Sequence, residues 1–345
     1  MTAIPEPFID GNPNPEYIQW MQLSDENYHS DRFFINSTVI KKSFNCMAQA
    51  AAHILGIQDL PHIDIKAALA GSLFHTKVLQ PHLVEQFLKD NQEDMLSSKE
   101  TVDHAAGCDT KCKCPQKKLK SGGFAKTKEH VPGCDKKCKC PRYREVYAEF
   151  KHIDTVVEVL RRHEAQTPEL AYALKGDAEK VMVGQIAGVW CKAKFDIVYA
   201  NGIEDSHITD LKTAANFHSK WDEARRCRVS WYDFLNYTEQ LAFYREIFML
   251  NTGYYPRSCY IVGMSKETIP DIDFLNFAYR PDPLTGGSIW NVKMKSITEQ
   301  LEGLRYLMSR GEIVDGVPSC GRCKYCRTSK VLIGATVIDG SDYGT

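Results

Sequence analysis

Hydrophobic side chains in the first quarter of the chain recur at intervals of three and four residues, which places them on one face of a helix. One such stripe consists of Phe44, Met47, Ala51 and Ile54. The same pattern predicts three helices in this part of the chain, over residues 37–55, 63–79 and 81–89. Residues 1–30 are rich in Pro and Asn, and we expect them to be irregular.

The pattern changes after residue 142. A helix is predicted over residues 143–162, and short runs of Val, Ile and aromatic residues then predict β-strands. The predicted strands cover residues 180–185, 189–200, 206–211, 255–264 and 272–279. Further helices are predicted over residues 221–226, 236–250 and 297–309. This order of elements predicts an α/β fold with a mixed central sheet flanked by helices.

Composition limits the class of protein. The chain has 345 residues, of which 43% are hydrophobic, enough for a sizeable core. The net charge is −1, but residues 108–142 carry ten Lys and one Arg against three acidic residues, a local charge of about +8. No apolar run approaches the ~20 residues needed to cross a membrane, and residues 1–25 lack a secretory signal pattern. We therefore expect a cytoplasmic protein whose 13 cysteines bind metal rather than form disulfides.

The candidate chemistry starts with four charged residues on or beside the predicted strands: Glu179, Asp196, Asp210 and Lys212. Carboxylates suit Mg²⁺, which prefers oxygen ligands and keeps several waters. Such an ion makes a water acidic enough to attack phosphorus. Because Lys212 lies two residues from Asp210, both side chains face the same way on a strand, and the ammonium can hold the water or a phosphate. The set predicts a metal-dependent phosphodiesterase.

Three more positions extend this set. Gln240 and Tyr244 lie one helical turn apart on one face, from which they could reach a phosphate or the attacking water. His75, on a predicted helix, offers a neutral imidazole as a further metal ligand. Each piece alone also fits ordinary structure, such as solvated strand-end charges or a core histidine. Their ordered combination favours a site.

Several segments resemble RecE-type exonucleases, the exonuclease VIII family of phage-borne PD-(D/E)XK nucleases. The resemblance spans most of residues 24–250 and rests on residues 24–30, 71–81, 176–179 with 188–196, 210–214 and 240–244. It implies a restriction-endonuclease-like core that cleaves DNA with Mg²⁺ or Mn²⁺. The stretch between Lys212 and Gln240 departs from the family pattern in its extra basic and aromatic residues, which either contact DNA or pack as a longer loop.

The same resemblance implies a role for each residue of the candidate site. The implied metal ligands are His75, Asp196, Asp210 and the carbonyl of Leu211. Glu179 would be a ligand or a support for the site, and Lys212 would orient the nucleophilic water. Gln240 and Tyr244 would position DNA or the water.

Residues 92–142 form a Cys- and Lys-rich insertion with an internal repeat. Each repeat offers one His and three Cys, a complete set for tetrahedral Zn²⁺: His104, Cys108, Cys112 and Cys114, then His130, Cys134, Cys138 and Cys140. Bound zinc would stabilise the fold of a segment that has too few apolar residues to fold alone. The two repeats could form separate sites or exchange ligands. Candidate contacts to DNA phosphates are Lys117, Lys118, Lys120, Lys126 and Lys128.

A second cysteine group consists of Cys320, Cys323 and Cys326, with Cys46 as the candidate fourth ligand. One early and three late cysteines around a nuclease core resemble the iron–sulfur nucleases of the AddB and Cas type. That resemblance implies a 4Fe–4S cluster, which takes four thiolates, although the Cys-x-x-Cys-x-x-Cys spacing is tighter than is usual there. Zinc at the same four cysteines is the alternative.

The resemblance to RecE-type exonucleases implies an exonuclease that resects linear duplex DNA ends for phage-type recombination or replication in a bacterial host cell. It also implies a single-strand annealing protein as partner and a homo-oligomer. Two alternatives stay open: an iron–sulfur single-strand or structure-specific repair nuclease, and a non-catalytic zinc-dependent nucleic-acid-binding protein. The predicted parts are the helical start of the nuclease domain (1–91), the insertion (92–142), the nuclease core with the late cysteines (143–326) and a tail (327–345).

Overall fold

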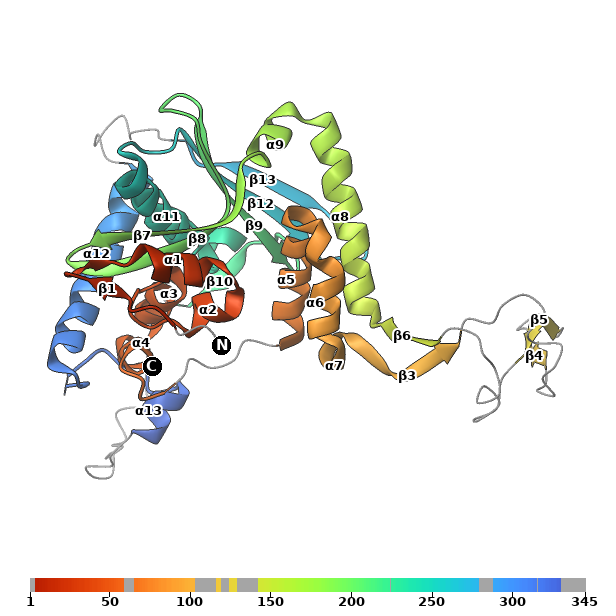
Figure 1. Cartoon of the computed structure of the whole chain (residues 1–345), viewed down its shortest axis with the longest axis horizontal. Helices are drawn as coiled ribbons and strands as arrows, with labels where there is room; N and C mark the ends of the chain where they lie inside the picture. The colour runs from red at the N-terminus through yellow and green to blue at the C-terminus, as the bar shows by residue number, and fades with distance from the viewer. Residues whose placement is uncertain are drawn as a thin grey trace, which may run out of the picture. The chain divides into compact units, whose positions relative to one another are not determined.

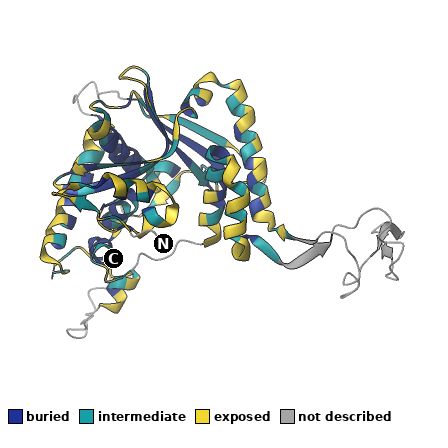
Figure 2. Cartoon of the chain, in the orientation of Figure 1, coloured by how far each residue is buried: buried dark blue, intermediate teal, exposed yellow. Residues whose placement is uncertain are grey.

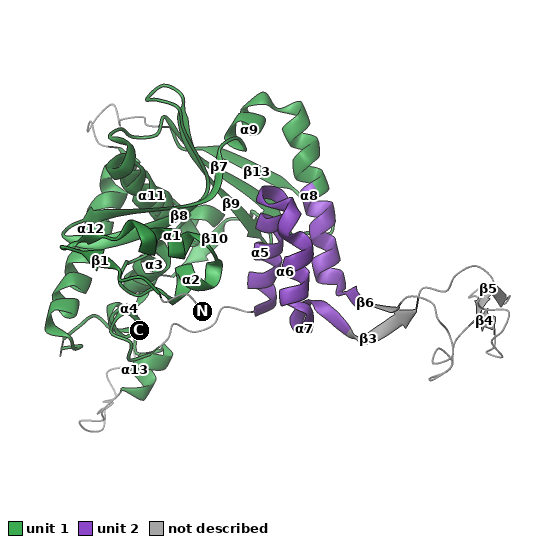
Figure 3. Cartoon of the chain, viewed as in Figure 1, with its two compact units in different colours: residues 1–63, 158–345 green, residues 64–157 purple. Residues whose placement is uncertain are grey.

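The computed structural model describes residues 4–58, 65–102, 116–118, 124–128, 142–223, 225–278, 288–314 and 316–329. The chain divides into two compact units (Figure 3). The first combines Met1–Ile63 with Glu158–Thr345, and the second is Asp64–Val157. No helix in the described ranges is both long and apolar enough to span a bilayer. The domain boundaries that the sequence suggests, after residues 91, 142 and 326, stay predictions.

A five-stranded mixed sheet forms the centre of the first unit, in the order β13-β12-β9-β8-β7 (Figure 1). Its strands are β7 (Asp177–Ile186), β8 (Val189–Ala200), β9 (Ser206–Ala214), β12 (Ser258–Ser265) and β13 (Ile272–Asn276). β9 and β12 pair in parallel, and the other neighbours pair antiparallel. The predicted α/β class with a mixed central sheet flanked by helices is confirmed.

Helices and two short strand pairs complete the first unit. The helices are α1 (Pro15–Gln22), α2 (Asp25–Ser30), α3 (Ser37–Asn45), α4 (Met47–Ile54), the last part of α8 (Ala148–Gln166), α9 (Pro168–Ala173), α10 (Trp231–Phe234), α11 (Tyr237–Thr252), α12 (Ile289–Arg310) and α13 (Lys324–Thr328). The strand pairs are β1 (Phe8–Ile9) with β2 (Asn12–Pro13), and β10 (Lys220–Asp222) with β11 (Cys227–Val229). α11 packs against β7 and β8 on one side and against α12 on another.

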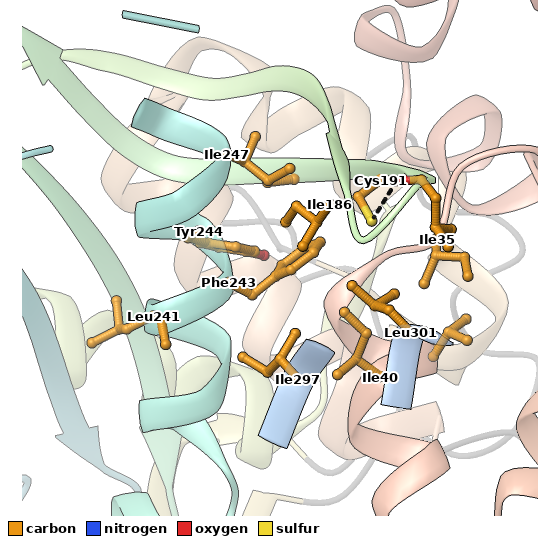
Figure 4. Close-up of a cluster of buried hydrophobic side chains, with 14 of the residues drawn as sticks. Ile35, Ile40, Ile186, Cys191, Leu241, Phe243, Tyr244, Ile247, Ile297 and Leu301 are labelled. Atoms are coloured by element: carbon orange, nitrogen blue, oxygen red, sulfur yellow. Dashed lines mark hydrogen bonds between the residues drawn. The ribbon is translucent and has the colours of Figure 1, made fainter. Parts of the chain in front are cut away.

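The hydrophobic core lies where the sheet, α3, α11 and α12 meet. Figure 4 shows Phe243 and Ile247 of α11, Ile297 of α12 and Ile40 of α3 in one cluster. The sheet strands and α11 are buried over much of their length, whereas α12 keeps an exposed outer face (Figure 2). The amphipathic pattern of α12 directs its apolar face inward, and α11 is buried on most of its surface, because burial of apolar area is the main favourable term in folding.

The second unit is mostly helical. Its elements are α5 (Ile65–Leu79), the 3₁₀ turn η1 (Pro81–Leu83), α6 (Val84–Asp90), α7 (Gln92–Met95), β3 (Leu96–Val102), β4 (Gln116–Lys118), β5 (Phe124–Lys128), β6 (Arg142–Val146) and the first part of α8 (Ala148–Gln166). β3 pairs antiparallel with β6, and Val102 lies opposite Arg142. The chain therefore leaves the β3–β6 ribbon after Val102 and rejoins it at Arg142, the residue directly opposite.

The sequence predictions of local structure are wrong at several points, among them residues 143–146, which form part of strand β6 rather than the start of a helix. Residues 37–55 form two helices rather than one, because Cys46 is extended (φ −164°) and both ends α3 and caps α4. Trp221 and Asp222, at the start of the helix predicted over residues 221–226, lie on β10 and pair with β11 instead. The start of the chain includes α1 and α2, whose first turns are capped by the side chains of Asn14 and Ser24.

Candidate active site

Asp196 and Asp210 lie where β8 and β9 stop pairing. The last residues paired across these strands are Ile197 and Thr209, and beyond Thr209 the β9 strand continues beside β12. The backbone N–H of Leu211 donates instead to Asp196 Oδ2, at 2.6 Å. A carboxylate thus replaces a backbone partner at the point where the ladder between β8 and β9 ends, which brings the two acids to one place in the sheet.

The two carboxylate oxygens of Asp210 have different surroundings, although the residue is 1% exposed. Oδ1 accepts hydrogen bonds from Lys212 Nζ at 2.6 Å and from Gln240 Nε2 at 3.1 Å. Oδ2 is buried and has no hydrogen-bond partner among the described residues. Burial raises the pKa of Asp210, and a buried polar atom left without a partner costs about 1–3 kcal/mol. An oxygen in this state fits a cation ligand.

Lys212 lies between the two acids. Its Nζ is 2.6 Å from Asp210 Oδ1 and 4.0 Å from Asp196 Oδ2, and it donates to the Leu211 carbonyl at 3.2 Å. Burial alone would lower the pKa of Lys212, but the charges of Asp210 and Asp196 raise it overall. The side chain is therefore a cation at neutral pH, able to donate hydrogen bonds but not to accept a proton.

Gln240 connects Asp210 to a cation that the sequence analysis missed. Its Oε1 accepts a hydrogen bond from Lys41 Nζ of α3 at 2.8 Å, while its Nε2 donates to Asp210. Burial, helped by the charge of Lys212, lowers the pKa of Lys41 to about 8. The position of Lys41 in the sequence could have identified it. Lys41 lies three residues before Phe44 and therefore continues the apolar stripe of that helix, where a charged residue is unusual.

Tyr244 follows Gln240 by one turn on α11 and points into the core. Its ring centroid lies 5.0 Å from that of Phe195, and the residue is 7% exposed. Figure 4 shows Tyr244 beside Phe243 in the core cluster. Burial, together with the charge of Asp210, raises the pKa of its phenol. Tyr244 therefore stays neutral, and its role in positioning DNA or water stays a prediction.

Glu179 adopts an unusual backbone conformation inside β7. Its φ is +56°, in the left-handed region that disfavours residues with a Cβ. The Gln22 side chain bridges the distortion: its Oε1 accepts from the Val181 N–H at 2.6 Å, and its Nε2 donates to the Glu179 carbonyl at 2.5 Å. Such strain persists only where the surroundings enforce it, and it is frequent at functional sites.

A lysine holds the Glu179 side chain. Lys194 of β8 forms ion pairs with both Glu179 and Asp25 of α2. The carboxylate oxygens of Glu179 and Asp196 lie within 4.8 Å of each other. The structure therefore brings Glu179 to the same region as Asp196, with its charge balanced by Lys194.

The other predicted residues divide into two groups. His75 lies half-buried on α5 of the second unit, and its role as a ligand stays a prediction. Lys117 and Lys118 lie on β4, and Lys126 and Lys128 on β5. The remaining predicted residues of the insertion lie outside the described residues: His104, Cys108, Cys112, Cys114, Lys120, His130, Cys134, Cys138 and Cys140.

The early and late cysteines come together as the sequence predicts. Cys46 lies at the break between α3 and α4, and its Sγ is 3.8 Å from that of Cys323 and 3.5 Å from that of Cys326. With Cys320, the four sulfur atoms all lie within 4.8 Å of one another, and none forms a disulfide.

The mixed sheet, the two acids at the end of the β8–β9 ladder and the lysine two residues on define a PD-(D/E)XK-like nuclease domain. The chain belongs to one such family, described as a PDDEXK-like domain of unknown function (DUF3799), whose model matches residues 36–329.

One solved structure shares the fold of this chain. A crystal structure named "Putative exonuclease", from Eubacterium rectale, is similar with a TM-score of 0.62 and 20% sequence identity, covering 93% of this chain and 97% of that chain. At this identity it shows a shared fold. A second structure, SSO0001, is 13% identical over 46% of this chain and 64% of its own, and its TM-score of 0.23 is too low to bear on the fold. No curated protein matches the chain.

Proposed function

We propose that the protein is a Mg²⁺-dependent DNA exonuclease that resects linear duplex ends, in phage-type recombination or replication by single-strand annealing. The supporting observation is Asp210, whose buried Oδ2 lacks a partner while Lys212 and Gln240 hold Oδ1. An annealing protein as partner and a homo-oligomer belong to the same proposal through the resemblance to RecE-type exonucleases.

The donor set fits a hard cation such as Mg²⁺ or Mn²⁺, because oxygen ligands suit these ions. Asp210 Oδ2 and the Asp196 carboxylate would hold it, and the Leu211 carbonyl and His75 are the further ligands that the resemblance implies. A bound ion of this kind acidifies a bound water and stabilises negative charge on a phosphoryl group.

The side chains around this position would orient the reactants. Lys212 is a cation at neutral pH, so it would donate a hydrogen bond to the nucleophilic water or to a phosphate oxygen rather than act as a general base. Gln240 fixes the orientation of the Asp210 carboxylate and of Lys41 at once. Lys41 adds a second positive group within reach of a phosphate backbone.

The β10–β11 hairpin is the DNA contact that we propose for the first unit. It follows the Lys212 strand, and its Trp221 is 51% exposed. Arg226 and Arg228 are exposed on the turn and on β11. An exposed indole can stack on a base, and arginines can pair with phosphates, which together give sequence-independent binding of single strands.

The experiment compares wild type with Lys212→Ala on end-labelled linear duplex, covalently closed circular and single-stranded DNA, with and without Mg²⁺. The matched control is Lys295→Ala, which removes an exposed lysine of α12. We expect degradation of linear duplex from its ends only with Mg²⁺, a loss of at least about 100-fold in Lys212→Ala, and unchanged cleavage in the control.

Each result separates the candidate functions. Preference for the single-stranded substrate would favour a repair nuclease instead. Binding without cleavage of any of the three substrates in the presence of Mg²⁺ would refute the proposed Mg²⁺-dependent catalysis.

A further inference from the structure

Four thiols from the two ends of the chain meet at the start of α4. Cys46 comes from the α3–α4 break, Cys320 and Cys323 from the segment after α12, and Cys326 from the first turn of α13. Cys46 and Cys326 are buried, and Ile313 and Val317 pack against them. The group does not contribute to the proposed cleavage chemistry.

The spacing of the sulfur atoms discriminates between the two metal centres. Four thiolates bound at ~2.3 Å to one tetrahedral ion lie about 3.8 Å apart. The observed Sγ–Sγ distances from Cys46 are 3.5 and 3.8 Å. In a 4Fe–4S cluster each thiolate binds a different iron, so irons and sulfides stand between the cysteines and hold them further apart. The arrangement fits one ion and does not fit the cluster.

Backbone donors also favour bound thiolates at this position. The N–H of Gln49 donates to Cys46 Sγ at 3.4 Å, the N–H of Cys323 to Cys320 Sγ at 3.2 Å, and the N–H of Cys326 to Cys323 Sγ at 3.4 Å. Hydrogen bonds to a charged acceptor are stronger than neutral ones, and such outer bonds orient metal ligands.

We propose that Cys46, Cys320, Cys323 and Cys326 bind a single structural Zn²⁺ rather than an iron–sulfur cluster. The ion would join the start of α4 to the C-terminal segment, where the Ala48 N–H already donates to the Pro318 carbonyl at 3.2 Å. Because α3 ends at Cys46, the ion would also fix the helix that carries Lys41.

The test measures zinc, iron and acid-labile sulfide per chain in full-length protein purified without oxygen. Wild type is compared with Cys320→Ser and with Cys227→Ser, which removes an exposed thiol of β11. We expect no iron or sulfide in wild type, one zinc ion fewer in Cys320→Ser, and unchanged zinc in Cys227→Ser. Any zinc bound by the insertion is present in all three proteins, so it cancels when the zinc content of a variant is subtracted from that of wild type.

Two results would overturn the proposal. One is iron and sulfide in equal, near-stoichiometric amounts in wild type, a measurement that does not depend on a variant that folds. The other is a zinc content that stays the same in folded Cys320→Ser. Neither result bears on DNA cleavage, so the metal assignment and the proposed nuclease can fail separately.

Discussion

At the scale of single residues, Asp210 carries the most direct prediction. Its Oδ2 has no partner in the described residues, so a cation bound there adds an interaction that the folded chain lacks. We expect Mg²⁺ at about 100 times its dissociation constant to raise the free energy of unfolding by about 2.7 kcal/mol. Asp210→Asn should abolish this gain, as followed by thermal unfolding of dialysed protein. Equal gains in both proteins would place the ion elsewhere.

Two substitutions of Glu179 separate the backbone strain at this position from the contribution of its carboxylate to cleavage. Its φ of +56° disfavours any residue with a Cβ, whereas glycine adopts this conformation freely. Glu179→Gly and Glu179→Gln both lose the carboxylate, but only the glycine relieves the backbone strain. We expect Glu179→Gly to be more stable than Glu179→Gln by about 1 kcal/mol in urea unfolding, and cleavage to fall at least about 10-fold in both. Equal stabilities would show that this conformation stores no strain.

His207 predicts how the fold responds to acid. It lies buried on β9 among the rings of Tyr172, Tyr199 and Tyr260, and burial lowers its pKa from 6.5 to about 4. The unfolded chain therefore binds a proton between these values that the folded chain does not. Stability falls as the pH falls through this window, by about 2 kcal/mol from pH 7 to pH 5.

The matched variant is His207→Phe, which keeps an aromatic ring without a titrating group. Urea unfolding at pH 7 and pH 5 should show an acid-induced loss that is smaller by about 2 kcal/mol in this variant. An unchanged loss would assign the acid sensitivity to other groups.

At the scale of elements, the β10–β11 hairpin carries the prediction on DNA binding. Trp221→Ala should weaken binding of a single-stranded end by about 1–3 kcal/mol if one base stacks on the indole. Arg228→Ala should reduce the slope of the logarithm of the binding constant against the logarithm of the salt concentration, by the amount that corresponds to about one phosphate contact. Fluorescence anisotropy at several salt concentrations measures both effects. Tyr306→Ala, which removes an exposed ring of α12, should bind as wild type does; a loss in this control would mean that the effect is not specific to the hairpin.

Local sequence patterns predict the strands of the sheet, but they do not predict the long-range contacts that hold the candidate site in place. β8 covers residues 189–200 as predicted, because Val189, Cys191, Ala193, Phe195 and Ile197 alternate along one buried face, while Lys192, Lys194 and Asp196 lie on the other. The break at Cys46 interrupts a continuous apolar stripe, and the side chain of Cys46 contacts cysteines near the other end of the chain. Likewise the Lys41–Gln240 hydrogen bond joins residues 199 positions apart. Spacing along the sequence cannot reveal such partners.

At the scale of the whole molecule, the insertion is attached in a way that permits its removal. β3 and β6 pair up to Val102 and Arg142, so the chain enters and leaves residues 103–141 at neighbouring positions. These residues hold all eight predicted zinc ligands of the insertion and most of the local positive charge. The catalytic residues proposed above lie outside this segment.

Replacing residues 103–141 by Asn-Gly should therefore close the β3–β6 ribbon as a two-residue hairpin. We expect kcat for duplex digestion to stay within about twofold, because the proposed catalytic set is untouched. The affinity for DNA should fall and its salt dependence should decrease, since lysine–phosphate contacts release counterions. Zinc content should drop by two ions per chain, leaving the one that we assign to Cys46 and its partners. Loss of cleavage in a folded deletion protein would instead make the insertion part of the catalytic machinery.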